Sequence, residues 1–191
     1  MKVGLFFGSF NPIHIGHMAL ANYMLEFGAL DKVWFVVSPH NPHKEKASLL
    51  DEKHRLRLVD LAIGDNAKMK ASDIEFKLPQ PSYTVNTLAY LKEKYPSYEF
   101  ALIMGADNLA NFHKWKNHEE ILKQCELLVY PRPETDGGSL RTHHKVKLID
   151  APLIEISSTF IRKAIKEKKD VRYFLPEATW KYIQEMHFYE K

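Results

Sequence analysis

Two histidines three residues apart, His14 and His17, stand near the start of the chain in the stretch GSFNPIHIGHMAL. Imidazoles at this spacing can bind a metal, exchange protons or donate hydrogen bonds to phosphate, and they also occur at ordinary helix starts. A structural zinc site needs four ligands, and the only cysteine, Cys125, lies far along the chain. A nucleophile–base pair would need a distinctive serine or cysteine motif, and none stands nearby. Phosphate binding and a buried structural role therefore both remain open.

The residues around the histidines favour phosphate binding. Gly8 and Ser9 directly follow an apolar run, so the backbone can turn tightly there and approach a ligand. Pro12 stiffens the loop, and the helix start behind it presents free N–H groups and a positive dipole end to an anion. Gly16 costs this helix about 1 kcal/mol relative to alanine, which is understandable if a ribose or base packs on its backbone. The pattern predicts a phosphate cradle that is neither a Walker A loop nor a full dinucleotide fingerprint.

Strand-like and helix-like segments alternate along the whole chain. Strands are predicted at residues 2–8, 32–37, 68–76, 99–105 and 126–131, with two short extended pieces at 145–149 and 152–156. Helices are predicted at about 14–27, 51–63, 84–95, 117–125 and 156–169, and Pro176 opens a terminal helix. Nearly continuous apolar strands between helices predict an α/β, Rossmann-like doubly wound parallel sheet with helices on both faces. We expect a single domain over residues 1–191, with a small C-terminal helical part at about 157–191.

Polar clusters follow the first, second and fourth predicted strands: GSFNPIH, SPHNPHK and GADN. In such sheets ligands bind beyond the carboxyl ends of the strands, where the strand order reverses. The coincidence of three clusters at this edge predicts the functional site there.

The composition limits the partners. The chain has 191 residues, ten histidines and a net charge of +3, which is too mild to argue for nucleic-acid binding. Its apolar runs are strand-sized and too short to span a bilayer. A single cysteine excludes an internal disulfide and fits a reducing cytoplasm. The oligomeric state stays open, with a homo-oligomer as one option.

Two stretches of the chain resemble known signatures. GSFNPIHIGH resembles the G-x-F-D-P-x-H-x-G-H signature of the nucleotidyltransferase superfamily, and ISSTFIR, at residues 156–162, resembles its second signature, I-S-S-T-x-I-R. Between them, SYTVNTL, GADNLANFHKW and VYPRP are similar to the bacterial nicotinate-nucleotide adenylyltransferase family. The resemblance covers residues 2 to about 186. The chain departs from the family pattern at Asn11, where aspartate is usual, and at Glu134, where glycine is usual.

The resemblance implies that the chain joins nicotinate mononucleotide to the AMP part of ATP, giving nicotinate adenine dinucleotide and pyrophosphate in NAD biosynthesis. The nucleophile is then a phosphate with a second pKa of about 6, which is largely dianionic at neutral pH and needs no general base. Positioning and charge neutralisation would carry catalysis. Mg²⁺ is expected on the ATP phosphates, held mostly by water, so no metal site made by the protein is predicted.

The resemblance also implies a role for each matching residue. The catalytic residues would be His14, His17 and Arg162. ATP would be bound by Gly8, Ser9, Phe10, Gly16, Lys44, Gly105, Asp107, Ile156, Ser158 and Thr159. Nicotinate mononucleotide would be bound by Asn41, Tyr83, Thr84, Trp115 and Arg132. On residue type alone, a solvated loop lysine at Lys44 and a helix N-cap at Asp107 remain alternatives.

Recognition of the pyridine ring is expected at the helix that begins near Thr84. The amides of Tyr83 and Thr84 would point free N–H groups forward, which favours a carboxylate over a carboxamide. Trp115 offers an aromatic face for stacking, and Lys114 and Lys116 beside it indicate an exposed segment. Nicotinate mononucleotide is therefore preferred over nicotinamide mononucleotide.

Other functions are compatible with part of the pattern. Phosphopantetheine adenylyltransferases share the fold and first signature, but they typically carry threonine at the position of His14 and are shorter. A cytidylyltransferase is another member of the superfamily. An inactive nucleotide-binding module belongs to a different class, and the two intact signatures argue against it.

Overall fold

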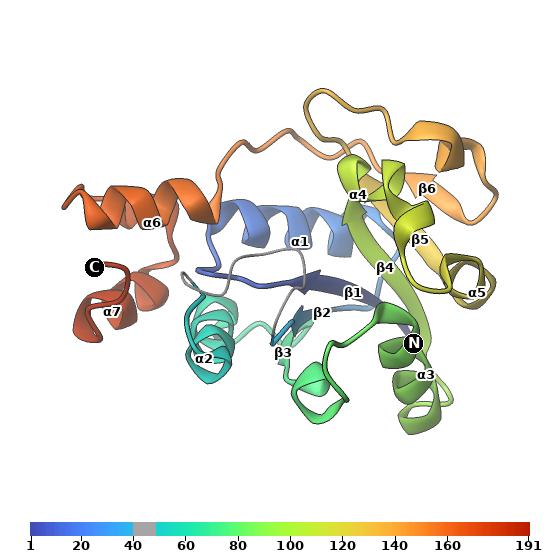
Figure 1. Ribbon diagram of the computed structural model, residues 1–191, viewed down its shortest axis with the longest axis horizontal. Coiled ribbons are helices and arrows are strands. Elements are labelled where there is room, and N and C mark those ends of the chain that lie inside the picture. Colours follow the sequence, from blue (N-terminus) through green and yellow to red (C-terminus); the bar gives the residue numbers. More distant parts are fainter. Residues whose placement is uncertain (40–48) are drawn as a thin grey trace.

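The fold is a parallel sheet, as predicted. The computed structural model describes residues 1–39 and 49–191, in which six parallel strands have the order β3-β2-β1-β4-β5-β6 (Figure 1). The strands are β1 (Lys2–Gly8), β2 (Lys32–Val37), β3 (Met69–Ser72), β4 (Glu99–Gly105), β5 (Glu126–Tyr130) and β6 (Val146–Leu148). Because β1 pairs with both β2 and β4, the strand order reverses between β1 and β4. This reversal is the switch point at which a doubly wound sheet binds its ligands.

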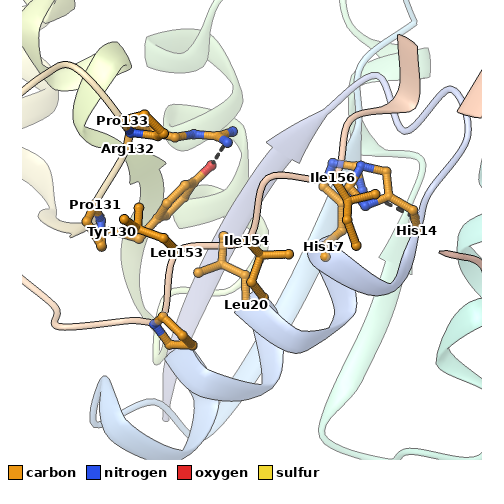
Figure 2. Close-up of a pocket in the computed structure, with 12 residues that line it drawn as sticks. His14, His17, Leu20, Tyr130, Pro131, Arg132, Pro133, Leu153, Ile154 and Ile156 are labelled. Carbon is orange, nitrogen blue, oxygen red and sulfur yellow. Dashed lines mark hydrogen bonds between the residues drawn. The ribbon is translucent and has the colours of Figure 1, made fainter. Parts of the chain in front are cut away.

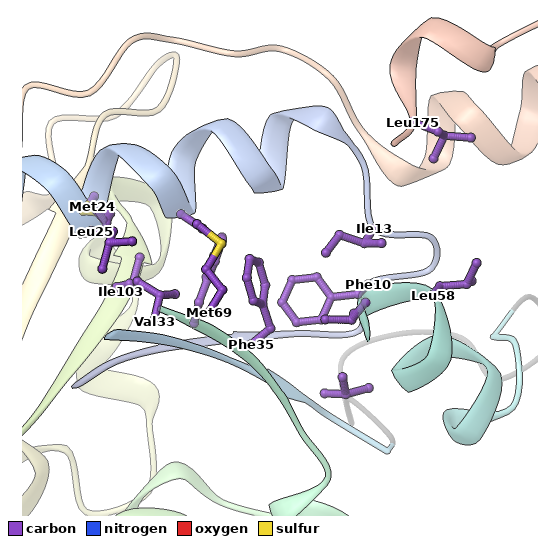
Figure 3. Packing of buried hydrophobic residues seen from close by; sticks show 14 of the residues in the cluster. Phe10, Ile13, Met24, Leu25, Val33, Phe35, Leu58, Met69, Ile103 and Leu175 are labelled. Atoms are coloured by element: carbon purple, nitrogen blue, oxygen red, sulfur yellow. The ribbon is translucent and has the colours of Figure 1, made fainter. Parts of the chain in front are cut away.

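Helices cover both faces of the sheet. They are α1 (Ile15–Phe27), α2 (Glu52–Ile63), α3 (Thr84–Lys94), α4 (Ala106–Ala110), α5 (His118–Gln124), α6 (Ser158–Lys166) and α7 (Glu177–Glu185). One core packs the sheet against α1, α2, α6 and α7 (Figure 3), and the other packs it against α3, α4 and α5. Along β2, Phe35 faces the first core while its neighbours Trp34 and Val36 face the second. Burial on both faces explains the continuous apolar runs. In the described part of the chain no helix is long and apolar enough to cross a membrane.

Three predicted elements differ from the structure. The strand predicted at 68–76 ends at Ser72, and Ile74–Lys77 instead forms a 3₁₀ turn, η2. This turn buries the carboxylate of Glu75 against the start of α3, and that contact overrides the extended pattern. The extended piece at 152–156 joins no strand. The helix predicted from residue 156 starts at Ser158, because the hydroxyl of Ser157 caps it by accepting a hydrogen bond from the Phe160 amide (3.1 Å).

The C-terminal helices pack onto the first half of the chain. Ile161 of α6 and Ile183 of α7 lie in the same core as α1 and α2. Thr179 Oγ1 donates to the carbonyl of Leu58 (3.3 Å), which fastens α7 to α2. In this position α6 begins beside the loop that follows β1 (Figure 1).

Candidate active site

Both histidines lie at the start of α1, His14 just before its first residue and His17 in its first turn. His14 is the extended N-cap residue, with φ −147° and ψ 172°. Its ring stacks on the ring of His17, with centroids 3.7 Å apart and planes 31° apart (Figure 2). The His14 amide donates to His17 Nδ1 (3.3 Å). The pair is thus placed at the helix start that the sequence predicts.

His14 is a buried, neutral imidazole. Its exposed fraction is 4%, and burial, with a smaller contribution from the charge of Arg132, lowers the pKa of His14 to about 4. Its Nδ1 and the hydroxyl of Ser9 are buried and have no hydrogen-bond partner in the described part of the chain. Such atoms are rare in folded proteins and call for a reason. Both atoms belong to the segment between β1 and α1.

The second signature is docked onto the loop that carries the first. Ser158 Oγ, at the start of α6, donates to the carbonyl of Pro12 (2.9 Å). Arg162 Nη1 donates to the carbonyl of Asn11 (2.8 Å), and Nη2 lies 3.5 Å from Thr159 Oγ1. Segments about 150 residues apart in sequence are therefore side by side. This is the juxtaposition that a two-part phosphate site requires.

A pocket opens between α1, the end of β5 and residues 152–156 (Figure 2). Its lining residues are His14, Gly16, His17, Leu20, Tyr130, Pro131, Arg132, Pro133, Pro152, Leu153, Ile154 and Ile156. A Cβ atom on Gly16 would lie 3.0 Å from His14 Nδ1 and 3.2 Å from Ile154 Cγ2. The chain's own side chains are thus enough to account for this glycine, and the packing of a ribose or base on its backbone stays a prediction.

Arg132 brings the loop after β5 into this pocket. Its Nε lies 3.6 Å from Asp107 Oδ1, and its guanidinium lies 5.1 Å from the centroid of the Tyr130 ring. The N-cap of α4 is Gly105, so the alternative N-cap role for Asp107 is wrong. Two residues on, Glu134 has a φ of +64°. This left-handed conformation favours glycine, which explains why the family usually has glycine there.

Tyr83, Thr84 and Trp115 form a second group that does not line the pocket. Thr84 is the first residue of α3, and Tyr83 is its extended N-cap. Lys116 Nζ lies 4.3 Å from the centroid of the Tyr83 ring. Trp115 is half-buried and packs on Phe112, with ring centroids 5.1 Å apart. Lys116 thus brings the segment that carries Trp115 to the start of α3, and a shared role of these residues in binding the pyridine ring stays a prediction.

Glu75 stabilises the start of α3 through hydrogen bonds. This residue was not identified from the sequence as part of the site. Its carboxylate accepts hydrogen bonds from Thr87 Oγ1 (2.9 Å) and Ser82 Oγ (3.0 Å). Burial raises the pKa of the Glu75 carboxyl, although these hydroxyl bonds oppose the shift. The carboxylate therefore fixes the turn that presents Tyr83 and Thr84.

Arg55 was also missed. It is fully buried, and its guanidinium donates to four carbonyls at 2.7–2.8 Å: those of Ser9, Ser38, Pro39 and Leu50. It ties the loop after β1 to the end of β2. One signal existed, because Arg55 precedes Leu58 and Val59 by three and four residues and so shares the buried face of α2.

Of the remaining predicted site residues, some lie in the core, one lines the pocket and two lie outside the described residues. Phe10, with φ +45°, is 3% exposed and packs its ring 5.2 Å from that of His17, so its side chain belongs to the core. Gly8 lies under the Phe10 ring, and Ile156 lines the pocket. Asn41 and Lys44 lie outside the described residues.

Comparisons with known proteins agree with this geometry. Residues 5–164 match the cytidylyltransferase-like family. A Flavobacterium psychrophilum protein named "probable nicotinate-nucleotide adenylyltransferase" is 58% identical, over 100% of both chains. A Christiangramia forsetii protein of the same name is 57% identical, over 99% of this chain and 98% of its own. The structure of Plasmodium falciparum nicotinic acid mononucleotide adenylyltransferase complexed with NaAD superposes with a TM-score of 0.82 at 21% identity, over 99% of this chain and 97% of that one. At this identity the superposition shows a shared fold.

Proposed function

Since the chain belongs to the nicotinate-nucleotide adenylyltransferase family, we propose that the pocket beside α1 is where it joins the AMP part of ATP to nicotinate mononucleotide. The reaction releases pyrophosphate and gives nicotinate adenine dinucleotide, a step of NAD biosynthesis. The observation that carries the assignment to this pocket is the docking of Arg162 and Ser158 onto the loop that leads into His14. These two bonds bring the signatures together at the start of α1, although Ser158 and Arg162 are not among the residues that line the pocket.

The histidines and α6 act on the phosphates of ATP. The attacking phosphate is already largely dianionic, so the site must hold two polyanions in line rather than remove a proton. His14 and His17 donate hydrogen bonds, with His17 at the α-phosphate as charge moves towards pyrophosphate. Ser158, Thr159 and Arg162 hold the β- and γ-phosphates. The position of both histidines in the lining of the pocket supports this role.

The rest of the pocket suits the adenosine part of ATP. Ile156 and the backbone at Gly16 provide an apolar wall on one side. Gly105 and Asp107, at the carboxyl end of β4, contact the ribose. The ion pair between Asp107 and Arg132 places a cation beside the pocket, where it also meets the phosphate of nicotinate mononucleotide. Ser9 and Lys44 complete the phosphate contacts.

The start of α3 recognises the nicotinate ring. The amides at Tyr83 and Thr84 donate to its carboxylate, and Trp115 stacks on the ring. Two observations support this subsite: the first turn of α3 holds no acidic residue, and Lys116 lies over Tyr83. Nicotinate mononucleotide is therefore preferred over the amide, which would bring an NH₂ group against N–H donors. Asn41 adds a polar contact.

Magnesium enters as part of the Mg-ATP substrate. No group of three or more histidine, cysteine, aspartate or glutamate residues within 1–39 and 49–191 could hold a metal ion. The donors that line the pocket suit phosphate oxygens rather than a bare cation. The reaction takes place in the cytoplasm, in keeping with a chain whose one cysteine forms no internal disulfide.

A product assay tests the function. The protein is incubated with Mg-ATP and, separately, with nicotinate mononucleotide, nicotinamide mononucleotide or phosphopantetheine, while pyrophosphate and the adenylylated product are followed. We expect the largest kcat/KM with nicotinate mononucleotide. An equal or larger value with nicotinamide mononucleotide would refute the carboxylate subsite. Turnover of phosphopantetheine alone would assign the rival activity, and ATP binding without any product would indicate an inactive module.

A further inference from the structure

The last residues of the chain fold back over α2 in a strained conformation. His187 and Tyr189 have φ values of +54° and +67°, in the left-handed region that bulky residues avoid. Contacts with the body of the protein hold the segment in place. The Phe188 ring packs on the His54 ring of α2 with centroids 4.9 Å apart. The Phe188 amide donates to the carbonyl of Ile183 (3.1 Å) and the His187 amide to that of Gln184 (3.2 Å), which closes the C-terminal end of α7 and accounts for the left-handed His187.

The strained segment ends on the loop of the first signature. Tyr189 Oη donates to Asn11 Oδ1 (2.9 Å), although the two residues are 178 positions apart. The same Asn11 oxygen accepts a hydrogen bond from the Leu50 amide (3.2 Å). The backbone carbonyl of Asn11 accepts the 2.8 Å bond from Arg162. Asn11 is 5% exposed, so it links the chain end to the second signature inside the protein.

The hydroxyl of Tyr189 lies near two positive charges. Burial raises its pKa, and the charges of Arg162 and Arg55 oppose that shift. The hydroxyl therefore stays protonated at neutral pH and donates to Asn11. Losing this donor would remove one of the hydrogen bonds that hold the Asn11 side chain and would weaken the placement of the carbonyl that orients Arg162.

We propose that Tyr189 is a positioning residue of the transfer reaction: its hydroxyl fixes Asn11, and the carbonyl of Asn11 fixes Arg162 beside the ATP phosphates. The proposal rests on the phosphate role of Arg162 given above. It makes the C-terminal segment, which carries neither signature, a part of the ATP site. None of these contacts joins Tyr189 to Tyr83, Thr84 or Trp115, the residues proposed to bind nicotinate. Changing Tyr189 should therefore affect the binding and turnover of ATP and leave the binding of nicotinate mononucleotide unchanged.

The first test compares Tyr189→Phe with Tyr173→Phe, a matched control whose side chain is 85% exposed. Both variants keep the ring and lose only the hydroxyl. We expect Tyr189→Phe to lower kcat/KM for Mg-ATP by about threefold to tenfold, the worth of one hydrogen bond. The KM for nicotinate mononucleotide and the control should stay at the wild-type value. Equal kinetics for the two variants, or a lower Tm with unchanged kcat/KM for ATP, would overturn the proposal.

A double-mutant cycle asks whether the effect passes through Arg162. In an Arg162→Ala background, Tyr189→Phe should cause no further loss of Mg-ATP affinity, measured by titration calorimetry. If the double variant instead loses the product of the two single-variant losses in Mg-ATP affinity, the two residues act independently and the proposal is contradicted. Calorimetry needs no turnover: a wild type that makes no dinucleotide refutes the proposed function, while weaker ATP binding by Tyr189→Phe still supports the role of Tyr189.

Discussion

His14 shows how the site handles charge. A buried imidazole with a pKa of about 4, stacked 3.7 Å from His17, is neutral at physiological pH. In the ligand-free protein the pair is therefore not two imidazolium cations. It offers directed N–H donors, and the full positive charges come from Arg132 and Arg162.

The burial of His14 predicts a pH-dependent stability. Its folded pKa of about 4 is below the ordinary 6.5, so the unfolded chain binds more protons between these values. The contribution of His14 is present above pH 6.5 and is lost as the pH falls towards 4. From pH 7 to pH 5 this one residue should remove about 2 kcal/mol from the free energy of unfolding.

Urea unfolding at both pH values, for the wild type and for His14→Gln, measures this contribution. Glutamine is polar but does not titrate, so the variant should lose less stability on acidification by about that amount. An identical pH dependence in the two proteins would show that His14 is not the buried neutral group described above.

Residue identities at the site were predictable where a motif carried them, and contacts between distant segments were not. His14, His17 and Arg162 stand in signatures with fixed spacing. Tyr189 lies 178 positions from Asn11, and no periodicity joins them. The spacing of Arg55 to Leu58 and Val59 placed it on the buried face of α2, but nothing in the sequence indicated its four carbonyl partners.

Three helix starts present the polar groups of the site. α1 begins at the histidines, α6 at Ser158 and α3 at Thr84. Each follows a residue in extended conformation, and the first amides of a helix have no partner within the helix, so such a start can donate to a ligand. Strand positions followed from apolar runs. The turn at Ile74–Lys77 could not be predicted from the apolar pattern, because it is stabilised by the hydrogen bond between the buried Glu75 carboxylate and Thr87 of α3.

The start of α3 can be tested by removing one amide hydrogen. Thr84 is the first helical residue, where proline fits, and Tyr83 before it has φ −119° and ψ 137°, which a following proline tolerates. Thr84→Pro should raise the KM for nicotinate mononucleotide by about tenfold, since it loses a hydrogen bond to a charged group. Thr84→Ala keeps the amide and serves as the control. If the alanine variant loses as much as the proline variant, the side chain rather than the amide binds the substrate.

The molecule is organised as one sheet with a core on each face, and the C-terminal helices share the first of these cores. Ile161 and Ile183 pack with residues of α1 and α2, and Tyr189 reaches the loop after β1. The alternation of apolar strands and helices predicted this architecture. It could not predict that the chain end would reach the loop after β1, because that contact depends on how α7 packs on α2 and on the path of the residues after α7.

Shared packing predicts that the chain behaves as a single domain, with residues 157–191 unfolding together with the sheet. Calorimetry should show one transition whose calorimetric enthalpy equals its van't Hoff enthalpy. Circular dichroism and tryptophan fluorescence should report the same midpoint. An earlier, separate transition that removes helix content alone would mean that α6 and α7 form an independent unit.

The most direct test of the phosphate site is the turnover of His17→Ala beside that of His113→Ala, which alters an exposed histidine. His17 is half-buried, so its loss should leave the protein folded, with a Tm close to that of the wild type. We predict that kcat falls by about a hundredfold or more, the cost of one donor to a developing oxyanion, while His113→Ala keeps full activity. A His17→Ala protein that unfolds but retains near-normal residual turnover would contradict the account and make His17 a core histidine.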